Sequence, residues 1–276
     1  MRIVTFRQNG IVRYGIRAGD SILVHPDAVS ATDLANRGTP LSDGDIVALA
    51  DVELLPPVPH PGKIICIGLN YRAHAIEGGN PIPDYPAVFM RCATSLTAPG
   101  GPIIYPTCSD KLDYEAELAV IIGKSARNVA VSEALDHVAG YSCFNDGTVR
   151  DYQRKSSQWT MGKNFDSTGG FGPELVTPDE LPLGAAGLRL VARLNGEIMQ
   201  DTSTADMIFD VATLVATLSE AMTLEPGDVI ATGTPSGVGY ARTPPVFMRP
   251  GDVIEIEIER IGTLRNVVAH HAATAT

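Results

Sequence analysis

Acidic and apolar residues alternate at the start of residues 112–123, and the segment then continues as an uninterrupted apolar run. Every second side chain of a strand lies on the same face, so Asp113, Glu115 and Glu117 are expected to point the same way. The apolar run is typical of a strand that is buried on both faces. Carboxylates that approach a buried interior must be paired, neutralised or bound to a cation. Because oxygen ligands suit Mg²⁺, Ca²⁺ or Mn²⁺, the pattern suggests a divalent metal site.

A second segment, residues 253–261, alternates in a similar way. Glu255, Glu257 and Glu259 are interleaved there with isoleucines. This is the ordinary pattern of a half-exposed strand, in which glutamates face water and isoleucines face the core. Periodicity alone therefore leaves two interpretations of the first segment open, a metal site and a solvated strand face.

Short apolar segments between turn residues predict a small β domain at the start of the chain, residues 1–58. Asn9-Gly10 and Gly19-Asp20 are its turn signals. Four prolines in residues 54–62 indicate an ordered linker to the rest of the chain. We expect strands at 2–6, 11–16 and 21–24, and a short helix at 31–36 or 43–50.

The remaining residues, 59–276, are predicted to form a larger second domain. Its clearest helix is expected at 204–221, where apolar residues recur every three to four positions. Ser203, Thr204 or Asp206 could cap the start of this helix. Many short strands, few helices, 27 glycines and 20 prolines indicate a mainly β, α+β architecture. The other expected elements are strands at 63–68, 140–144, 228–231 and 253–261, and short helices at 71–77 and 130–137.

Composition narrows the possible partners. The formal net charge of −11 gives an acidic surface that repels phosphate backbones, which argues against a nucleic-acid partner. Four scattered cysteines fit neither a disulfide framework nor a zinc site. The first residues lack the apolar core of a signal peptide, and no apolar run approaches the length of a membrane span. These features predict a cytoplasmic protein with no membrane partner.

Residues 145–166 contain several groups that could carry chemistry. Asp146 follows a strand-like segment, a position from which a carboxylate can reach a cleft, although a turn or helix-cap role is commoner there. Arg150 and Gln153 follow within seven residues, and Lys163 lies in a further segment around Trp159. Each of the two cations, considered alone, is more typical of a surface residue.

Two other motifs are weaker. His74 and Glu77 are spaced to share one face of a helix, where the carboxylate could orient the imidazole as a general base. Pairs with this spacing also arise by chance. The glycine-rich segment 232–239 could cradle an anion with its backbone N–H groups, or could be a plain loop. It does not fit the nucleotide P-loop pattern.

Taken together, seven segments resemble the fumarylacetoacetate hydrolase (FAH) superfamily. The resemblance implies a mixed β-sandwich roll with a small N-terminal β domain and a homodimeric assembly. It covers roughly residues 60–268, which makes the second domain the catalytic one. The segments are, in chain order, GLNYRAH (68–74), LDYEAELAVIIG (112–123), NDGTVRD (145–151), the Lys163 segment, MIFDVATLVATLS (207–219), TLEPGDVIATGTPSGVG (223–239) and IGTLRN (261–266).

The resemblance also implies a Mg²⁺ or Mn²⁺ site. Glu115, Glu117 and Asp146 occupy the positions of the family's metal ligands. Asp113 does not match a ligand, so it is expected to support the site without binding the metal. In fumarylacetoacetase itself a further carboxylate comes from the strand before the catalytic histidine, and here that position is Ile67. This departure puts fumarylacetoacetate in doubt as the substrate.

Further positions match the family's catalytic and substrate-binding residues. His74 and Glu77 match a dyad that activates water. Arg150, Gln153 and Lys163 match groups that bind substrate oxygens or a developing oxyanion. Thr234 is a sixth such position, and it matches a residue that contacts the substrate carboxylate.

These matches predict metal-dependent hydrolysis of a C–C bond in a 2,4-dioxo acid, releasing pyruvate or a related 2-oxo acid. The substrate would be an acylpyruvate, such as fumarylpyruvate or maleylpyruvate, or a diketo-deoxy sugar acid. The alternative is oxaloacetate decarboxylation or dienol-acid isomerisation on the same metal site. The His74–Glu77 pair favours hydrolysis because decarboxylation needs no attacking water. Contacts to the acyl group are expected from residues 80–91 and from the N-terminal β domain.

Overall fold

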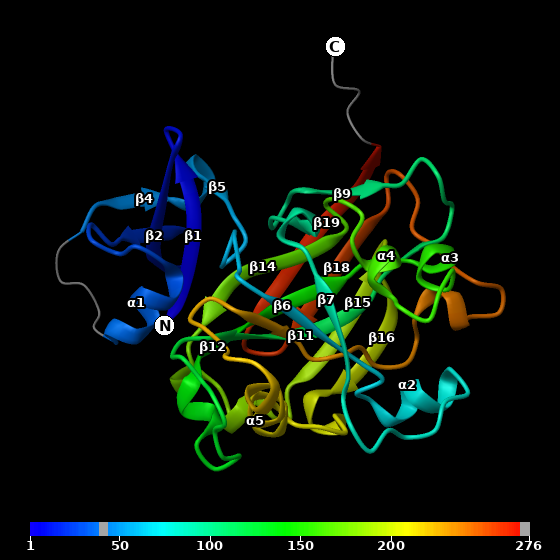
Figure 1. Cartoon of the computed structure of the whole chain (residues 1–276). Coiled ribbons are helices and arrows are strands. Elements are labelled where there is room, and N and C mark those ends of the chain that lie inside the picture. The colour runs from blue at the N-terminus through cyan, green and yellow to red at the C-terminus, as the bar shows by residue number, and fades with distance from the viewer. Residues whose placement is uncertain (39–43, 271–276) are drawn as a thin grey trace.

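Two β-sheets account for most of the fold (Figure 1). The computed structural model describes residues 1–38 and 44–270. The large sheet has twelve strands: β1 (Arg2–Gln8), β2 (Ile11–Ala18), β3 (Ser21–Val24), β4 (Ile46–Ala48), β5 (Glu53–Leu54), β6 (Ile64–Gly68), β7 (Ala87–Arg91), β8 (Leu96–Thr97), β11 (Ala116–Ile122), β12 (Val138–Asp146), β14 (Gly169–Val176) and β17 (Val229–Ala231). The small sheet has five: β9 (Pro102–Tyr105), β15 (Arg189–Leu194), β16 (Glu197–Ser203), β18 (Val253–Ile258) and β19 (Gly262–His270).

The remaining elements are short. A two-stranded ladder joins β10 (Leu112–Asp113) to β13 (Thr148–Val149). The helices are α1 (Ala31–Arg37), α2 (Arg72–Glu77), α3 (Arg150–Gln153), α4 (Thr160–Lys163) and α5 (Val211–Ala221). No helix among the described residues is long and apolar enough to cross a membrane.

The large sheet has the order β4-β3-β2-β1-β14-β12-β11-β17-β6-β7 along its main path. β17 pairs with β11 in an antiparallel ladder and with β6 in a parallel one, so the sheet is mixed. The small sheet is also mixed, because β9 joins β19 in parallel while its other pairs are antiparallel. The prediction of a mainly β fold with mixed sheets is confirmed.

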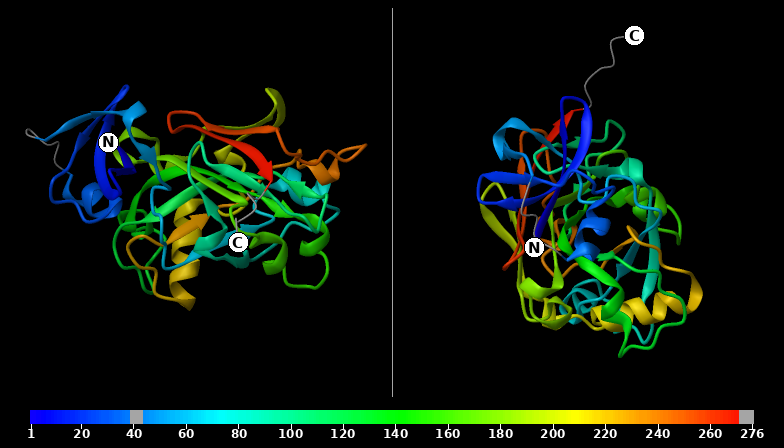
Figure 2. Two further views of the ribbon diagram at one scale, coloured as in Figure 1. Left: turned by 90° about the horizontal axis from the view of Figure 1, so that it is seen from above. Right: turned by 90° about the vertical axis from the view of Figure 1, so that its left-hand side faces the viewer.

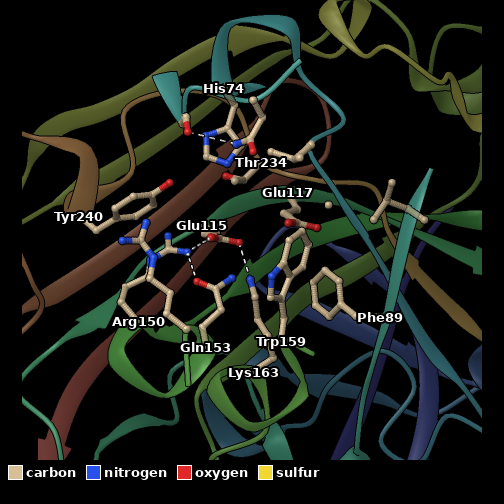
Figure 3. Close-up of a pocket in the computed structure, with 16 residues that line it drawn as sticks. His74, Phe89, Glu115, Glu117, Arg150, Gln153, Trp159, Lys163, Thr234 and Tyr240 are labelled. Carbon is tan, nitrogen blue, oxygen red and sulfur yellow. Dashed lines mark hydrogen bonds and ion pairs between the residues drawn. The ribbon is translucent and has the colours of Figure 1, made fainter. Parts of the chain in front are cut away.

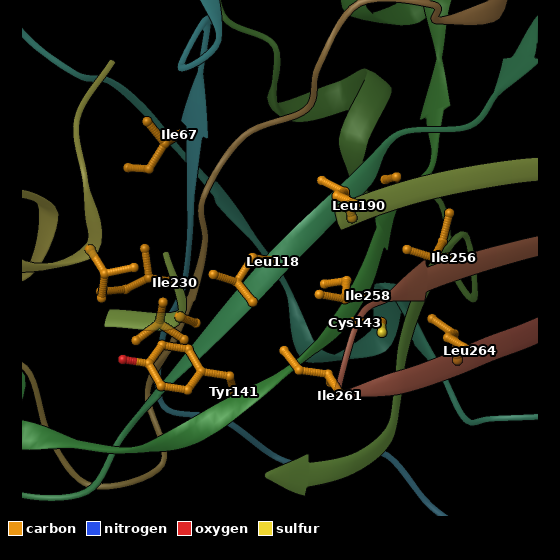
Figure 4. Packing of buried hydrophobic residues seen from close by; sticks show 14 of the residues in the cluster. Ile67, Leu118, Tyr141, Cys143, Leu190, Ile230, Ile256, Ile258, Ile261 and Leu264 are labelled. Atoms are coloured by element: carbon orange, nitrogen blue, oxygen red, sulfur yellow. The ribbon is translucent and has the colours of Figure 1, made fainter. Parts of the chain in front are cut away.

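The main core lies between the two sheets (Figure 4). Leu118 of β11 and Tyr141 of β12 belong to the same buried cluster as Leu190 and Ile256 of the small sheet. The alternate β11 residues, Ala119 and Ile121, belong to a second cluster on the opposite face. β11 is therefore buried on both faces, as its apolar run predicts. In β18 the isoleucines are buried and the glutamates half-buried, so this strand has the solvated pattern.

The N-terminal strands form one end of the large sheet (Figure 2). β1 pairs with β14, which brings Arg2 opposite Val176. The Arg2 guanidinium also donates to the buried carboxylate of Glu174 at 2.6 Å. Because strands of both parts share one sheet, the division of the chain at residue 58 stays a prediction.

Two expected helices differ from the structure. The predicted helix at 204–221 begins only at Val211, because Asp210 accepts from the Thr213 N–H at 2.8 Å and caps the helix there. Residues 204–206 form a separate 3₁₀ turn capped by Ser203. In residues 130–137 only a 3₁₀ turn at Ala134–His137 is present.

Of the two sites proposed for a short N-terminal helix, the first is correct. Ser30 accepts from the Asp33 N–H at 2.9 Å and caps α1. Residues 46–51 instead form β4 and a 3₁₀ turn, and Asp43 lies outside the described residues.

The expected strand at 112–123 is interrupted between Asp113 and Ala116. Asp113 pairs in the short β10–β13 ladder instead of continuing the face that carries Glu115 and Glu117.

Candidate active site

Three buried carboxylates meet where β11 and β12 run side by side. Antiparallel pairing sets Ala116 opposite Asn145, so Glu115, just before β11, lies next to Asp146 at the end of β12. The Asp146 N–H donates to the Glu115 carbonyl at 2.9 Å. One carboxylate oxygen from each of Glu115, Glu117 and Asp146 lies within 4.8 Å of the others. The structure therefore brings together the three predicted metal ligands.

Three buried cations surround these carboxylates. Lys163 Nζ lies 2.7 Å from Glu115 Oε2 and 2.5 Å from Asp146 Oδ2. Arg91 Nη1 lies 2.5 Å from Asp146 Oδ1, the other oxygen of the same carboxylate. Two of the three carboxylates are thus neutralised by direct ion pairs, while Glu117 makes none with the described cations.

Arg150 links the triad to Asp113. Its Nη1 lies 2.7 Å from Glu115 Oε1, and its Nε donates to Asp113 Oδ2 at 2.8 Å. Asp113 also accepts from the Gly239 and Tyr240 N–H groups at 2.8 and 3.0 Å. As expected, Asp113 supports the site without joining the triad, and its contacts explain why its side chain leaves the face of Glu115.

The charge balance of this buried cluster is negative. Four carboxylates, including Asp113, face the cations Arg91, Arg150 and Lys163. Burial tends to raise the pKa of Glu115, but Lys163 and Arg150 outweigh it and lower this pKa to about 2. Among the described residues, Glu117 has only the Gly233 N–H as a donor, at 2.9 Å. Burial and the neighbouring Asp146 and Glu115 raise the pKa of Glu117 well above its usual value.

A divalent cation fits this cluster. Three buried carboxylates offer the oxygen donors that hard divalent ions prefer. Glu117, once ionised, has no cation partner among the described residues, and such an ion would neutralise its charge. The cluster can therefore hold a metal, in agreement with the sequence-based hypothesis.

The His74–Glu77 pair forms as predicted on α2. His74 Nδ1 lies 3.1 Å from Glu77 Oε2, and the imidazole lines the same cavity as Glu115 and Glu117. Glu77 Oε1 accepts from the Gly237 N–H at 2.8 Å. This bond ties α2 to the glycine-rich segment and holds the imidazole above the carboxylates (Figure 3).

The predicted substrate-binding residues line the cavity as well. Arg150 Nη1 donates to Gln153 Oε1 at 3.1 Å, which aligns the two side chains on α3. Thr234 lies across the cavity in the segment 232–239. The predicted anion cradle of that segment is partly used within the protein, because its Gly233 N–H donates to Glu117.

The cavity has a volume of about 260 Å³ and two chemically different ends (Figure 3). At one end the guanidinium groups of Arg150 and Arg154 lie 4.4 and 4.5 Å from the centre of the Tyr240 ring. At the other end Trp159 and Phe89 form an edge-to-face pair with ring centres 5.5 Å apart. Ile67, in place of the additional carboxylate, also lines the cavity.

The two regions expected to contact the acyl group, residues 80–91 and the N-terminal β domain, differ in what they contribute to the cavity wall. Residues 80–91 contribute Asn80 and Phe89 to the cavity wall, as expected. None of the described residues of the N-terminal β domain lines this cavity, because the domain joins the large sheet at the opposite end.

Several residues of the site carry no strong signal in the sequence. Arg91 could have been noticed as a lone cation ending the apolar strand β7. Tyr240 lies in a short 3₁₀ turn at Gly239–Ala241 and Trp159 directly before α4, two segments without a clear sequence pattern. Gln200, which contacts Thr234, looks like an ordinary surface residue of a strand.

Known proteins resemble the chain over almost its full length. Residues 63–269 match the family model described as fumarylacetoacetate (FAA) hydrolase C-terminal, and residues 1–57 match one described as Rv2993c-like, N-terminal. Oxaloacetate tautomerase YisK of Bacillus subtilis is 44% identical over 257 residues, which cover 92% of this chain and 84% of that protein.

Solved structures agree in fold. A fumarylacetoacetate hydrolase from psychrophilic Exiguobacterium antarcticum is 38% identical, has a TM-score of 0.86, and aligns over 98% of this chain and 100% of its own. The 2-hydroxyhepta-2,4-diene-1,7-dioate isomerase from Mycobacterium marinum is 33% identical, has a TM-score of 0.83, and aligns over 99% of both chains.

Proposed function

Because the chain belongs to the fumarylacetoacetate hydrolase family, we propose that it is a Mg²⁺- or Mn²⁺-dependent enzyme that tautomerises a small 2-oxo acid, with oxaloacetate as the leading substrate. The names of its relatives support this choice over the predicted hydrolysis. One relative is named an oxaloacetate tautomerase and another a 2-hydroxyhepta-2,4-diene-1,7-dioate isomerase. Both names describe reactions that move a proton within an unsaturated acid. The alternative from the sequence is thus better supported than the main prediction.

The observation that carries the proposal is the composition of one small cavity. His74 and the carboxylates Glu115 and Glu117 line the same space of about 260 Å³. This volume lies below the roughly 300–1,000 Å³ of common ligand pockets, which favours a compact substrate. A divalent cation held by the carboxylates would supply positive charge beside the developing negative charge of the substrate.

Side chains of the protein would carry out the proton transfer and stabilise the charge that develops. His74, oriented by Glu77, removes a proton from C3 of the oxo acid while the C2 oxygen gains one, which gives the enol. The reverse transfer converts the enol back to the oxo acid. Lys163 remains cationic, because Asp146 and Glu115 raise its pKa in spite of burial. Lys163 and Arg150 thereby favour the anionic transition state.

The cationic end of the cavity suits a second carboxylate. Arg154 makes no ion pair with an acid among the described residues, and its guanidinium lies against Tyr240. An unneutralised guanidinium at a cavity wall can bind a carboxylate by charge-assisted hydrogen bonds. Oxaloacetate carries a distal carboxylate, whereas a simple acylpyruvate does not.

Acylpyruvate hydrolysis is the second candidate, and the His74–Glu77 pair favours it. In that reaction His74 would take a proton from water, hydroxide would add to the C4 carbonyl, and the C3–C4 bond would break with protonation of C3. The two reactions differ in their products, since tautomerisation releases no pyruvate.

The test compares both activities in one preparation with Mg²⁺ or Mn²⁺. Loss of the ultraviolet absorbance of enol-oxaloacetate measures tautomerisation, and coupled assays for pyruvate and CO₂ measure hydrolysis and decarboxylation. We expect enol loss to exceed both other rates. Faster release of pyruvate from acetylpyruvate would favour the hydrolase, and enol loss at the spontaneous rate would refute the tautomerase.

We also propose that the protein is a homodimer in the cytoplasm. β7 is the edge strand of the large sheet and exposes Val88 and Met90, which supports pairing with a second copy. Light scattering during gel filtration tests this, and a monomeric mass at micromolar concentration would contradict it.

A further inference from the structure

Gln200 is buried although it lies on an edge strand of the small sheet. In the ladder between β15 and β16, Ala192 pairs with Gln200 and Arg193 with Ile198, so Met199 is an extra residue in a β-bulge. The bulge breaks the alternation of the strand, and both Met199 and Gln200 point inward. Gln200 is only 1% exposed and contacts the segment that carries Thr234.

The segment 232–239 packs directly against this bulge. A Cβ atom at Gly237 would lie 2.2 Å from the Met199 carbonyl oxygen, so no other residue fits there without a shift. Gly237 also has φ of +101°, which L-residues rarely adopt. Gln200 is thereby held in a fixed position beside Thr234.

Two backbone groups fix the orientation of the Gln200 amide. The Ala116 N–H, which can only donate, lies 2.9 Å from Gln200 Oε1. The Pro235 carbonyl, which can only accept, lies 2.9 Å from Gln200 Nε2. The second N–H of the amide therefore donates to Thr234 Oγ1, at 2.8 Å.

This arrangement determines whether the Thr234 hydroxyl donates or accepts a hydrogen bond in the cavity. Its oxygen accepts from Gln200, and its hydrogen has no acceptor among the described residues. Thr234 is 4% exposed and lines the cavity. The hydroxyl hydrogen is thus free to be donated into the cavity, toward an oxygen that can only accept.

We propose that Gln200 is a positioning residue that turns the Thr234 hydroxyl into a hydrogen-bond donor for a carboxylate oxygen of the substrate. This inference rests on the proposed site for a 2-oxo acid. Because Ala116 begins β11, the same chain of hydrogen bonds also links the Thr234 contact to the strand that carries Glu117. The bulge of β16 thereby sets the distance between Thr234 and the strand that carries Glu117.

The test measures binding without turnover. Oxalate is a stable dianion whose oxygens only accept hydrogen bonds, and it can be titrated in the presence of Mn²⁺. Trp159 is the single tryptophan of the chain and lines the cavity, so its fluorescence reports the titration, with calorimetry as an independent measurement.

Thr234 is varied first. Thr234→Val keeps the shape but removes the hydroxyl, and should weaken oxalate binding roughly 10- to 100-fold, the range for a hydrogen bond to a charged group. Thr234→Ser should retain most of the affinity. Thr202→Val is the matched control, since Thr202 lies on β16, the strand of Gln200, and its hydroxyl bonds to Asp206 outside the cavity.

Gln200 is then varied alone and with Thr234→Val. Gln200→Met removes the donor, and Gln200→Glu keeps an acceptor for Ala116 but offers Thr234 an acceptor in place of a donor. Both should weaken oxalate binding in the wild-type background and cause no further loss in the Thr234→Val background.

Two results would overturn the inference: equal losses in both backgrounds, which would indicate a purely structural role, or full affinity in both Gln200 variants. A failure of the wild type to tautomerise oxaloacetate would refute the proposed function and leave this cycle interpretable, because oxalate binding requires no reaction.

Discussion

Replacing Glu117 by glutamine should have opposite effects on the metal-free and metal-loaded protein. The Glu117 carboxylate is 1% exposed, accepts one hydrogen bond from Gly233 and lies beside two other carboxylates. Its pKa is raised, so the folded state releases this proton later than the unfolded state does. The metal-free protein therefore loses stability as the pH rises from the unfolded value of about 4.3 through the folded pKa, with a slope of at most about 1.4 kcal/mol per pH unit.

The size of the effect follows from these relations. Above the folded pKa, each unit by which the pKa is raised costs the metal-free protein about 1.4 kcal/mol. For a chain of this size that corresponds to about 3–6 °C in Tm. Glu117→Gln removes the cost and should raise the metal-free Tm at pH 8. Saturation of the wild type with Mn²⁺ at 100 times Kd should add about 2.7 kcal/mol, and the variant should lose most of this gain.

Calorimetric unfolding at pH 5 and pH 8, with EDTA or with Mn²⁺, measures both effects. Glu257→Gln is the matched control, because it removes a carboxylate from the other acidic strand where the side chain is 43% exposed. Its Tm should change little and its response to Mn²⁺ not at all. The reasoning is refuted if Glu117→Gln lowers the metal-free Tm at pH 8, or if it retains the full Mn²⁺ response.

Three further substitutions test the other parts of the cavity. His74→Ala should lower kcat for oxaloacetate tautomerisation by roughly 10²–10⁴-fold and leave the Mn²⁺-induced rise in Tm intact; near-full activity would contradict its role. Arg154→Ala should raise KM for oxaloacetate by about threefold to tenfold with little change in kcat. An equal rise for acetylpyruvate would argue against a contact to the distal carboxylate. Gly68→Ala would place a methyl group 2.2 Å from the Trp159 ring, so the tryptophan emission should shift and KM should rise; an unchanged spectrum would contradict this packing.

The sequence predicted those parts of the fold that depend on local patterns. The N-terminal strands β1–β3 and the buried strand β11 follow from turn residues and from an apolar run. The start of α5 did not follow, since several residues before it can cap a helix and tertiary contacts select Asp210. Met207, which fits the helical periodicity, is instead held in a β-bridge with Tyr71. A periodic pattern therefore locates a helix better than it locates the end of one.

The site was predictable to the extent that single strands carry it. Alternation identified Glu115 and Glu117, because the face of β11 that carries Glu117 extends to Glu115, the residue just before the strand. It failed for Asp113, where the strand is interrupted, and for Gln200, where a bulge turns a residue of an edge strand inward. Both irregularities arise where distant segments pack together, Asp113 against residues 239–240 and Gln200 against residues 234–235. The groups that support a site are thus the hardest to infer from sequence, because their side chains reach it only where the strand pattern breaks.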